Sequence, residues 1–367
     1  MQANLALTGS ILHYFRKNKK MKKFLLASLL LLTVSSVFAQ QPYYDDVDLT
    51  LTGQDLYFEL QAKISDASGS FTYGDVRDTM KITDKDPAVS ANVLLVYGYD
   101  DTGSCTTDRS RDKDDFGGTS CEYNREHVFA RSNASPDMGS VSNATTGIGA
   151  DPHNLRPSDQ QMNNNKGNKK FADGSGNAGD VGSGNWYPGD EWKGDVARMM
   201  MYMYTRYGDR CLPSLNGVGA VQGSTDMLQV YLQWNVDDPV SDLEEQRNPY
   251  LELNYGNRNP FIDNPVLATI IWGGPIAEDT WNILAVSEVA SENISIYPVP
   301  AQEILWVQST TTFQPSEFAL YDINARKVLG QTLNVSEGID VSSLEAGIYF
   351  LALTSSEERV IKKVVID

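Results

Sequence analysis

NREHVFARS, residues 124–132, contains a histidine directly after a glutamate. A second histidine lies in DPHNLRP, residues 151–157, and a run of amides with one lysine follows in NNNKGN, residues 163–168. The sequence has three histidines, and the third, His13, lies near the N-terminus. Two histidines, carboxylate and amide oxygens and several cations, all close in sequence, suit the hydrolysis of phosphodiester bonds. An imidazole with a near-neutral pKa can deprotonate water, and cations can offset phosphate charge.

The same segments favour a hard metal ion. Carboxylate and amide oxygens suit magnesium, with calcium as the alternative, and are less suited to zinc. Each segment also has a simpler interpretation, because a histidine beside a glutamate is commonly a surface or core residue and an Asn-rich hexapeptide is commonly a solvated turn. Neighbours on a regular strand point to opposite faces. Glu126 and His127 can therefore face one phosphate only if the strand ends or bends there.

The N-terminal residues predict export. Residues 21–39, MKKFLLASLLLLTVSSVFA, have the order of charge, apolar core and small residues that is typical of a signal peptide, with cleavage after Ala39. Residues 1–20 add only a basic tail, so we expect translation to start at Met21. The apolar run is shorter than the roughly 20 residues that cross a bilayer. The mature chain is therefore predicted to be secreted, without a membrane span.

Charge and cysteine content refine this prediction. Residues 1–39 hold six of the 30 basic residues and none of the 48 acidic ones, which leaves 24 basic against 48 acidic residues and a net charge of −24. Such an acidic balance, taken alone, argues against a nucleic-acid binder unless a local cleft is basic. The three cysteines of an exported chain predict one disulfide, with Cys105–Cys121 as the nearest pair, or else three buried thiols.

The sequence pattern of the chain changes near residue 287, from mainly helical to strand-like. Residues 40–286 are predicted to form one α+β domain that is mainly helical. Helical spacing is seen in Asp55–Ile64 and in 190–207, where Gly208 is expected to end the helix, and Val93–Tyr97 reads as a short buried strand. The helix over 190–207 is predicted to bury one apolar stripe, with Asp190 and Glu191 favouring its N-terminal dipole. Residues 174–189 are rich in Gly, Ser and Asn and predict a surface loop.

A polar stretch, 287–292, is predicted to be a linker to a second domain, 293–367. Short runs of β-branched and aromatic residues between turn signals predict a small all-β sandwich there. The expected strands are Ile294–Tyr297, Ile304–Val307, Phe318–Asp322, Gly347–Leu353 and Val360–Ile366. This domain contains no His or Cys and therefore no obvious chemistry.

Six ordered blocks of the first domain resemble the bacterial endonuclease I family, over roughly residues 50–275. They are Asn124-Arg-Glu-His-Val128, Asp151-Pro-His-Asn-Leu155, Asn163 with Asn168, Lys193-Gly-Asp-Val-Ala-Arg198, Asp238-Pro-Val-Ser241 with Glu244, Arg247 and Asn248, and Gly256-Asn-Arg-Asn-Pro-Phe261. The resemblance implies a secreted or periplasmic nuclease with a helical domain built around a ββα-metal finger. It also implies that the strand ends at the Glu-His pair and that the following helix supplies an asparagine.

Carried over by position, the resemblance implies that His127 is the general base and that Glu126 and Asn163 hold the metal. His153, with Asp151, then fits a supporting role better than that of a second base.

The chain also departs from the family pattern. Ala130 stands where proline is common, and Lys166 where arginine is usual. Some family members have a transition-state arginine some twenty residues past the base, but residues 134–150 contain no arginine here. The sequence leaves four candidates for the missing cation, which are Arg131, Arg156, Lys166 and Arg258.

The second domain resembles the C-terminal sorting domain of type IX secretion cargo. The likeness rests on Ile296-Tyr-Pro-Val-Pro300, Asp322-Ile-Asn-Ala-Arg326, Leu344-Glu-Ala-Gly-Ile-Tyr349 and Lys363-Val-Val-Ile366. It implies secretion machinery as a partner and a secreted or cell-surface location. An accessory binding module is the alternative interpretation.

Other enzyme signatures are absent from the sequence. There is no Gly-x-Ser-x-Gly nucleophile elbow and no phosphate-binding Gly-x4-Gly-Lys-Ser/Thr loop. We therefore predict a secreted, magnesium-dependent endonuclease that cuts DNA, RNA or both with little sequence specificity. The alternative is a weak or inactive relative that serves as a secreted binding protein or adhesin.

Overall fold

A computed structural model describes residues 41–65, 67, 69, 71–102, 105–284, 294–309, 314–323, 326–334, 337–355 and 359–367. The predicted leader and signal peptide (1–39) and the predicted linker (287–292) lie outside these residues. Within the described ranges, no helix is both long and apolar enough to span a membrane.

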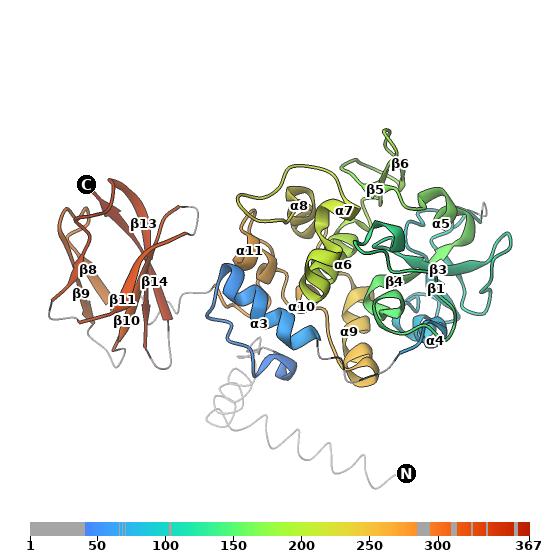
Figure 1. Ribbon diagram of the computed structural model, residues 1–367, viewed down its shortest axis with the longest axis horizontal. Helices are drawn as coiled ribbons and strands as arrows, with labels where there is room; N and C mark the ends of the chain where they lie inside the picture. The colour runs from blue at the N-terminus through green and yellow to red at the C-terminus, as the bar shows by residue number, and fades with distance from the viewer. Residues whose placement is uncertain are drawn as a thin grey trace, which may run out of the picture. The chain divides into compact units, whose positions relative to one another are not determined.

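The residues before 285 are rich in helix, and those from 294 onward are all β, which confirms the predicted α+β class (Figure 1). The α-helices of the first part are α3 (Gly53–Ser65), α4 (Tyr73–Thr83), α5 (Gln160–Lys166), α6 (Lys193–Tyr207), α7 (Pro213–Asn216), α8 (Gln229–Asp237), α9 (Asp242–Tyr255), α10 (Pro260–Asp263) and α11 (Val266–Trp272). The 3-10 turns are η1 (Pro42–Tyr44), η2 (Arg131–Asn133), η3 (Gly147–Ala150), η4 (Pro152–Asn154) and η5 (Gly208–Cys211). The strands are β1 (Asn92–Leu94), β2 (Ser110–Asp112), β3 (Tyr123–His127), β4 (Leu155–Asp159), β5 (Lys170–Phe171), β6 (Gly179–Asp180) and β7 (Asn185–Tyr187).

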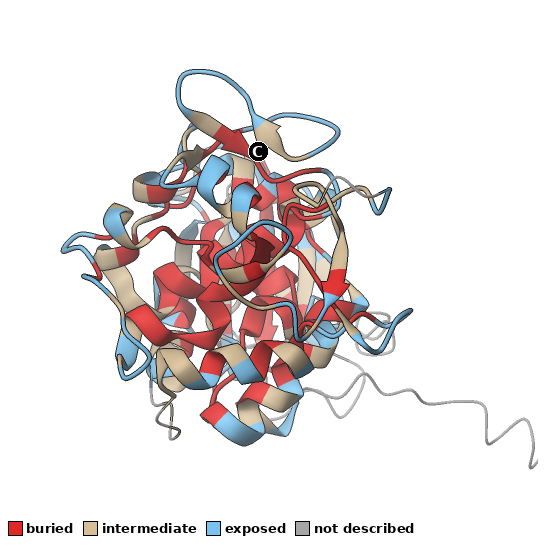
Figure 2. Ribbon diagram, turned by 90° about the vertical axis from the view of Figure 1, so that its right-hand side faces the viewer, coloured by how far each residue is buried: buried red, intermediate tan, exposed pale blue. Residues whose placement is uncertain are grey.

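Helix α6 is at the centre of the first core. It packs against α3 and α8, and every residue from Gly194 to Thr205 is buried. Figure 2 shows buried segments gathered towards the middle of the view, with half-buried and exposed segments around them. The predicted apolar stripe lies in the core, and the remaining sides of the helix are buried as well because partners cover nearly all of it. Gly208 ends the helix as predicted, with a φ of +55° that glycine adopts without strain.

The predicted start of α6 was wrong. The helix begins at Lys193, because the Asp190 carboxylate is engaged outside it, accepting hydrogen bonds from the Tyr187 hydroxyl and, at 2.9 Å, from the backbone N–H of Gly176. Trp186 and Tyr187 are buried in β7, which pairs with β5 and β6. The predicted surface loop over 174–189 therefore contains two short strands.

The other predicted elements of the first part are present. Helix α3 covers the predicted Asp55–Ile64, and β1 begins near the predicted strand at Val93 but ends at Leu94. Leu95, Val96 and Tyr97 are buried although they lie outside the strand. The apolar run therefore predicted burial correctly, but the strand itself is shorter than predicted.

The C-terminal part consists of two sheets. Their orders are β11-β10-β13-β14 and β12-β9-β8, and all neighbours are antiparallel. Leu305, Leu351 and Val364 are among the buried residues of their shared core, which confirms the sandwich. The bounds are β8 (Ile294–Tyr297), β9 (Ile304–Ser309), β10 (Glu317–Tyr321), β11 (Lys327–Thr332), β12 (Ile339–Asp340), β13 (Gly347–Thr354) and β14 (Arg359–Ile366). Five of these match predicted strands, and β11 and β12 are additional.

Candidate active site

Strands β3 and β4 and helix α5 form a continuous ββα unit. The two strands pair antiparallel, and His127 is the last residue of β3. Strand β4 leads directly into α5, whose first turn is capped by the Asp159 carboxylate. This carboxylate accepts two backbone N–H hydrogen bonds, at 2.8 and 3.0 Å. Helix α5 packs against both strands and carries Asn163. The unit therefore brings together the three residues to which the family resemblance gave base and metal roles.

A pocket of about 570 Å³ opens at this unit. Glu126, His127, Arg131 and Asn163 all line it. Because β3 ends at His127, regular strand alternation stops there, and the two neighbouring side chains reach the same pocket. The other lining residues are Tyr73, Arg125, Ala130, Ser132, Asp137, Gly139, Ser140, Gly167 and Asn168.

The imidazole of His127 is held by a backbone carbonyl. Its Nε2 atom lies 2.8 Å from the carbonyl oxygen of Gly149 in η3. A carbonyl oxygen only accepts, so Nε2 carries the proton and Nδ1 keeps its lone pair. Burial lowers the pKa of His127 to about 4, with the Gly149 hydrogen bond opposing this shift. The side chain is therefore neutral near pH 7 and able to accept a proton.

Glu126 is buried beside a lysine. Its Oε1 atom accepts a hydrogen bond from the Tyr97 hydroxyl at 3.2 Å and lies 3.6 Å from Nζ of Lys166. Burial raises the pKa of Glu126 to about 7, and the Lys166 charge acts against this rise. Lys166 is itself completely buried, and it does not line the pocket. Its positive charge therefore compensates Glu126 and is not available to a substrate phosphate.

Asn163 is oriented by a neighbouring amide. Its Nδ2 group donates to Oδ1 of Asn124 at 2.7 Å and to the backbone carbonyl of Arg125 at 3.4 Å. Both donor positions of the amide are thus engaged within the protein. The carbonyl oxygen Oδ1 remains as the ligand atom that this side chain can offer in the pocket.

Of the four cation candidates, only Arg131 lines the pocket. It donates to the carbonyl of Gly139 at 2.5 Å and forms no ion pair with a described residue. Sequence reasoning missed a second lining arginine, Arg125, and an aromatic residue, Tyr73. A signal for Arg125 was available in the sequence, because Arg125 lies directly before Glu126 in the same motif. No comparable signal pointed to Tyr73, which begins α4 far away in sequence.

Arg156 and Arg258 lie elsewhere and form ion pairs with carboxylates. Arg156 is 2.6 Å from the Asp84 carboxylate and 3.0 Å from that of Asp195. Arg258 is paired with Glu252 at 2.8 Å and with Asp263 at 2.5 Å. Neither arginine lines the pocket, and their carboxylate partners already balance their charge. The structure therefore does not bring these two arginines to the pocket that contains His127.

Asp151 and His153 lie in the protein interior. The Nε2 atom of His153 is 3.0 Å from Oδ1 of Asn257, and the imidazole packs on the ring of Tyr202 with 4.5 Å between centroids. The Asp151 carboxylate forms an ion pair with Arg206 at 2.8 Å. Neither Asp151 nor His153 lines the pocket. Their contacts are those of structural residues.

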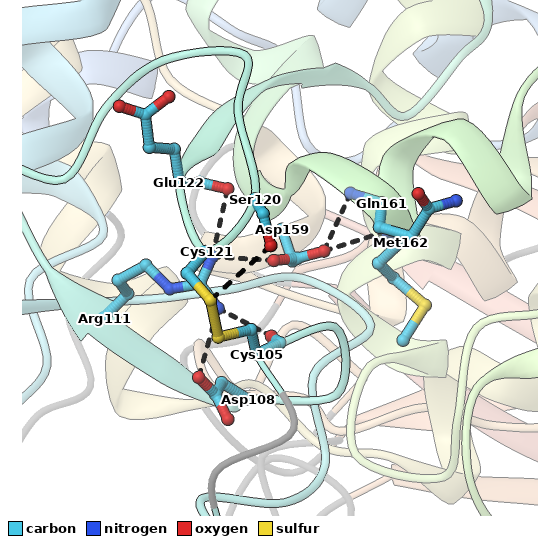
Figure 3. The surroundings of a disulfide bond; sticks show 9 residues. All are labelled: Cys105, Asp108, Arg111, Ser120, Cys121, Glu122, Asp159, Gln161 and Met162. Atoms are coloured by element: carbon cyan, nitrogen blue, oxygen red, sulfur yellow. Dashed lines mark hydrogen bonds and ion pairs between the residues drawn. A yellow bond between two sulfur atoms is a disulfide. The ribbon is translucent and has the colours of Figure 1, made fainter.

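The single disulfide of the described chain is linked to α5 through an arginine (Figure 3). Cys105 and Cys121 are bonded as predicted, and Cys211 is a buried free thiol. Arg111 donates to the Cys105 carbonyl at 2.6 Å and to the Asp159 carboxylate at 2.7 Å. Because Asp159 caps α5, the disulfide loop supports the helix that carries Asn163.

Comparisons with known proteins agree with this geometry. Residues 52–266 match the Endonuclease I family, and residues 295–367 match the secretion system C-terminal sorting domain. An extracellular ribonuclease of Bacillus subtilis (strain 168) is 39% identical over 245 residues, which are 63% of this chain and 78% of the relative. An extracellular ribonuclease of Bacillus amyloliquefaciens is 40% identical over 216 residues, 55% of this chain and 68% of the relative. The sorting domain and the extracellular relatives confirm the prediction of a secreted or cell-surface protein.

Proposed function

This chain belongs to the endonuclease I family of nucleases, and on that premise we propose that it is a metal-dependent endonuclease of RNA and DNA. His127 activates the attacking water, and cleavage has little sequence specificity. RNA is included because two relatives are named ribonucleases. DNA is included because a base that activates water does not need a 2′-hydroxyl.

One observation carries the assignment of the base. The hydrogen bond between Nε2 of His127 and the Gly149 carbonyl leaves Nδ1 as the proton acceptor of a neutral imidazole that lines the pocket. A water molecule that gives its proton to Nδ1 becomes a nucleophile toward phosphorus. Positioned acid–base groups of this kind accelerate reactions by roughly 10² to 10⁴.

Glu126 and Asn163 fit a magnesium site in this pocket. A carboxylate and an amide oxygen are hard ligands, and magnesium usually keeps several waters and takes only one or two carboxylates from a protein. The described residues contain no group of three His, Cys, Asp or Glu that could hold a metal, which fits such an open site better than a closed protein cage. A divalent cation held there would polarise the phosphate and offset its developing charge.

Arg131 supports the proposal as a phosphate contact. Its guanidinium lines the pocket and has no carboxylate partner among the described residues, so its charge can attract the substrate backbone. It is the one residue of the four original cation candidates for which the pocket supports this role.

The decisive experiment is incubation of the purified protein with RNA and with plasmid DNA, in magnesium and in chelator. We expect internal cuts in both polymers with magnesium and none in chelator. Activation of water predicts RNA products without 2′,3′-cyclic phosphate ends, since the 2′-hydroxyl takes no part. Binding without cleavage in magnesium would instead favour a secreted binding protein, and cyclic phosphate ends would exclude water as the nucleophile.

A further inference from the structure

Most arginine side chains of the described chain form ion pairs with carboxylates. These are Arg77, Arg109, Arg111, Arg156, Arg198, Arg206, Arg247, Arg258 and Arg326. Among the arginines whose side chains the structure describes, Arg125, Arg131 and Arg210 have no ion pair. Two of these three, Arg125 and Arg131, line the pocket at His127. Arginines without a carboxylate partner are therefore found mainly where the substrate phosphate is proposed to lie, beside His127.

Arg125 is held more firmly than a surface arginine. The carbon of its guanidinium lies 3.6 Å from the ring centroid of Tyr73. The same guanidinium donates to the backbone carbonyl of Tyr73 and, at 3.4 and 3.5 Å, to Oδ1 of Asn143. All of these partners are neutral. They fix the direction of the guanidinium without cancelling its charge.

Tyr73 is itself fixed by its position. It is the first residue of α4, directly after Thr72, which forms a capping box with Asp75. Its backbone N–H donates to the carbonyl of Thr145 at 2.7 Å. Its ring also stacks on the imidazole of His127, with 5.5 Å between centroids and 15° between planes. One anchored ring therefore contacts both the proposed base and Arg125.

We infer that Arg125 is a catalytic residue that contacts the scissile phosphate and stabilises the charge that develops on it. The inference rests on the proposed function. Arg125 and His127 both line the pocket and are two residues apart in β3, so a phosphate attacked by water at His127 lies within the reach of the Arg125 guanidinium. A guanidinium matches two phosphate oxygens with parallel N–H donors. A donor that is already oriented before the reaction stabilises the transition state without a free-energy cost for its own reorganisation.

The test uses Arg125→Gln in the full chain. Glutamine removes the charge but keeps a planar amide that can lie on Tyr73 and donate to its carbonyl, so the fold is preserved. We expect kcat/KM for RNA to fall by about 10² to 10³, the range for loss of one transition-state donor. We also expect the log–log salt slope of RNA binding, measured in chelator, to become shallower by about 0.7, the value for one phosphate contact on a single strand.

Two further variants separate charge from architecture. Arg125→Lys keeps a point charge and should recover most of the salt slope but only part of kcat/KM. Arg109→Ala loses an arginine outside the pocket and should match the wild type in both measurements. Wild-type kcat/KM in Arg125→Gln overturns the inference, and so does lost activity with an unchanged salt slope. Failure of the wild-type protein to cleave at all overturns the proposed function instead.

Discussion

Nζ of Lys166 lies 3.6 Å from Oε1 of Glu126, and both side chains are buried. The lysine, which stands where the family commonly has arginine, is thus the charge partner of the proposed metal ligand. Removing one partner of a buried ion pair leaves an uncompensated charge and commonly costs about 3–5 kcal/mol.

We therefore expect Lys166→Met to lower the melting temperature in chelator. Magnesium should then raise the melting temperature of the variant more than that of the wild type, because the cation becomes the sole compensating charge for Glu126. Differential scanning fluorimetry over a magnesium titration measures both shifts. Equal magnesium shifts in the two proteins would argue against a metal at Glu126.

His127→Ala should slow cleavage by roughly 10² to 10⁴, because the variant lacks the group that deprotonates water. Steady-state cleavage of a fluorogenic oligonucleotide measures the loss, and circular dichroism confirms that the variant is folded. His127 has little exposed surface, so His127→Gln provides a second variant of closer size. A folded alanine variant that cuts as fast as the wild type would remove His127 from the mechanism.

Asn163→Ala should weaken metal activation without removing the base. The variant lacks the amide oxygen proposed to bind the cation, so the magnesium concentration for half-maximal activity should rise and excess magnesium should restore part of the rate. Asn165→Ala is the matched control, since that side chain is exposed on the same helix and does not line the pocket. An unchanged magnesium dependence for Asn163→Ala would contradict the assigned ligand.

His153 gives the protein a pH-dependent stability. Burial lowers its pKa from 6.5 to about 4, so the folded state binds fewer protons than the unfolded state between these values. The contribution of His153 to the free energy of unfolding is therefore fully present above pH 6.5 and is lost as the pH drops toward 4. His153→Gln should lose less stability than the wild type between pH 7 and pH 4.5, by about 2 kcal/mol, in urea unfolding. Parallel curves for the two proteins would refute a neutral buried His153.

The C-terminal domain should be dispensable for catalysis and required for export. Its hydrophobic core is separate from that of the helical part, and all residues that line the pocket lie between positions 73 and 168. A chain that ends after Leu284 should fold and cleave at close to the full rate. In the native host it should accumulate in the periplasm. Activity assays of medium and periplasm test this, and secretion of the shortened chain would count against the sorting role.

Local patterns predicted local structure well. Short runs of β-branched and aromatic residues located five strands of the sandwich, because such side chains pack well on the core face of a strand. Strand β11 was not predicted because Gly330 and Gln331 interrupt its apolar pattern. Strand β12 was not predicted because it has only two residues. The start of α6 was misplaced because the apolar pattern does not reveal that the Asp190 side chain is bound by Tyr187 and Gly176.

The same limit applies to the site. Ordered sequence motifs pointed to His127, Glu126 and Asn163, and the fold brings these three residues to one pocket. The sequence could not separate Arg131 from Arg156, because the difference lies in Asp84 and Asp195, which neutralise Arg156 from distant parts of the chain. Tertiary structure determines which carboxylate pairs with each arginine or lysine. The cations that remain available to a substrate can therefore be identified only from the folded structure.

The buried position of Cys211 has a consequence for the covalent integrity of the exported protein. Thiol–disulfide exchange begins with attack by a thiolate, and burial raises the pKa of Cys211 to about 12. At neutral pH this sulfur is almost entirely protonated and shielded from other molecules. The odd cysteine can then neither scramble the Cys105–Cys121 bridge nor cross-link two folded chains, so a chain with three cysteines keeps a single covalent form outside the cell.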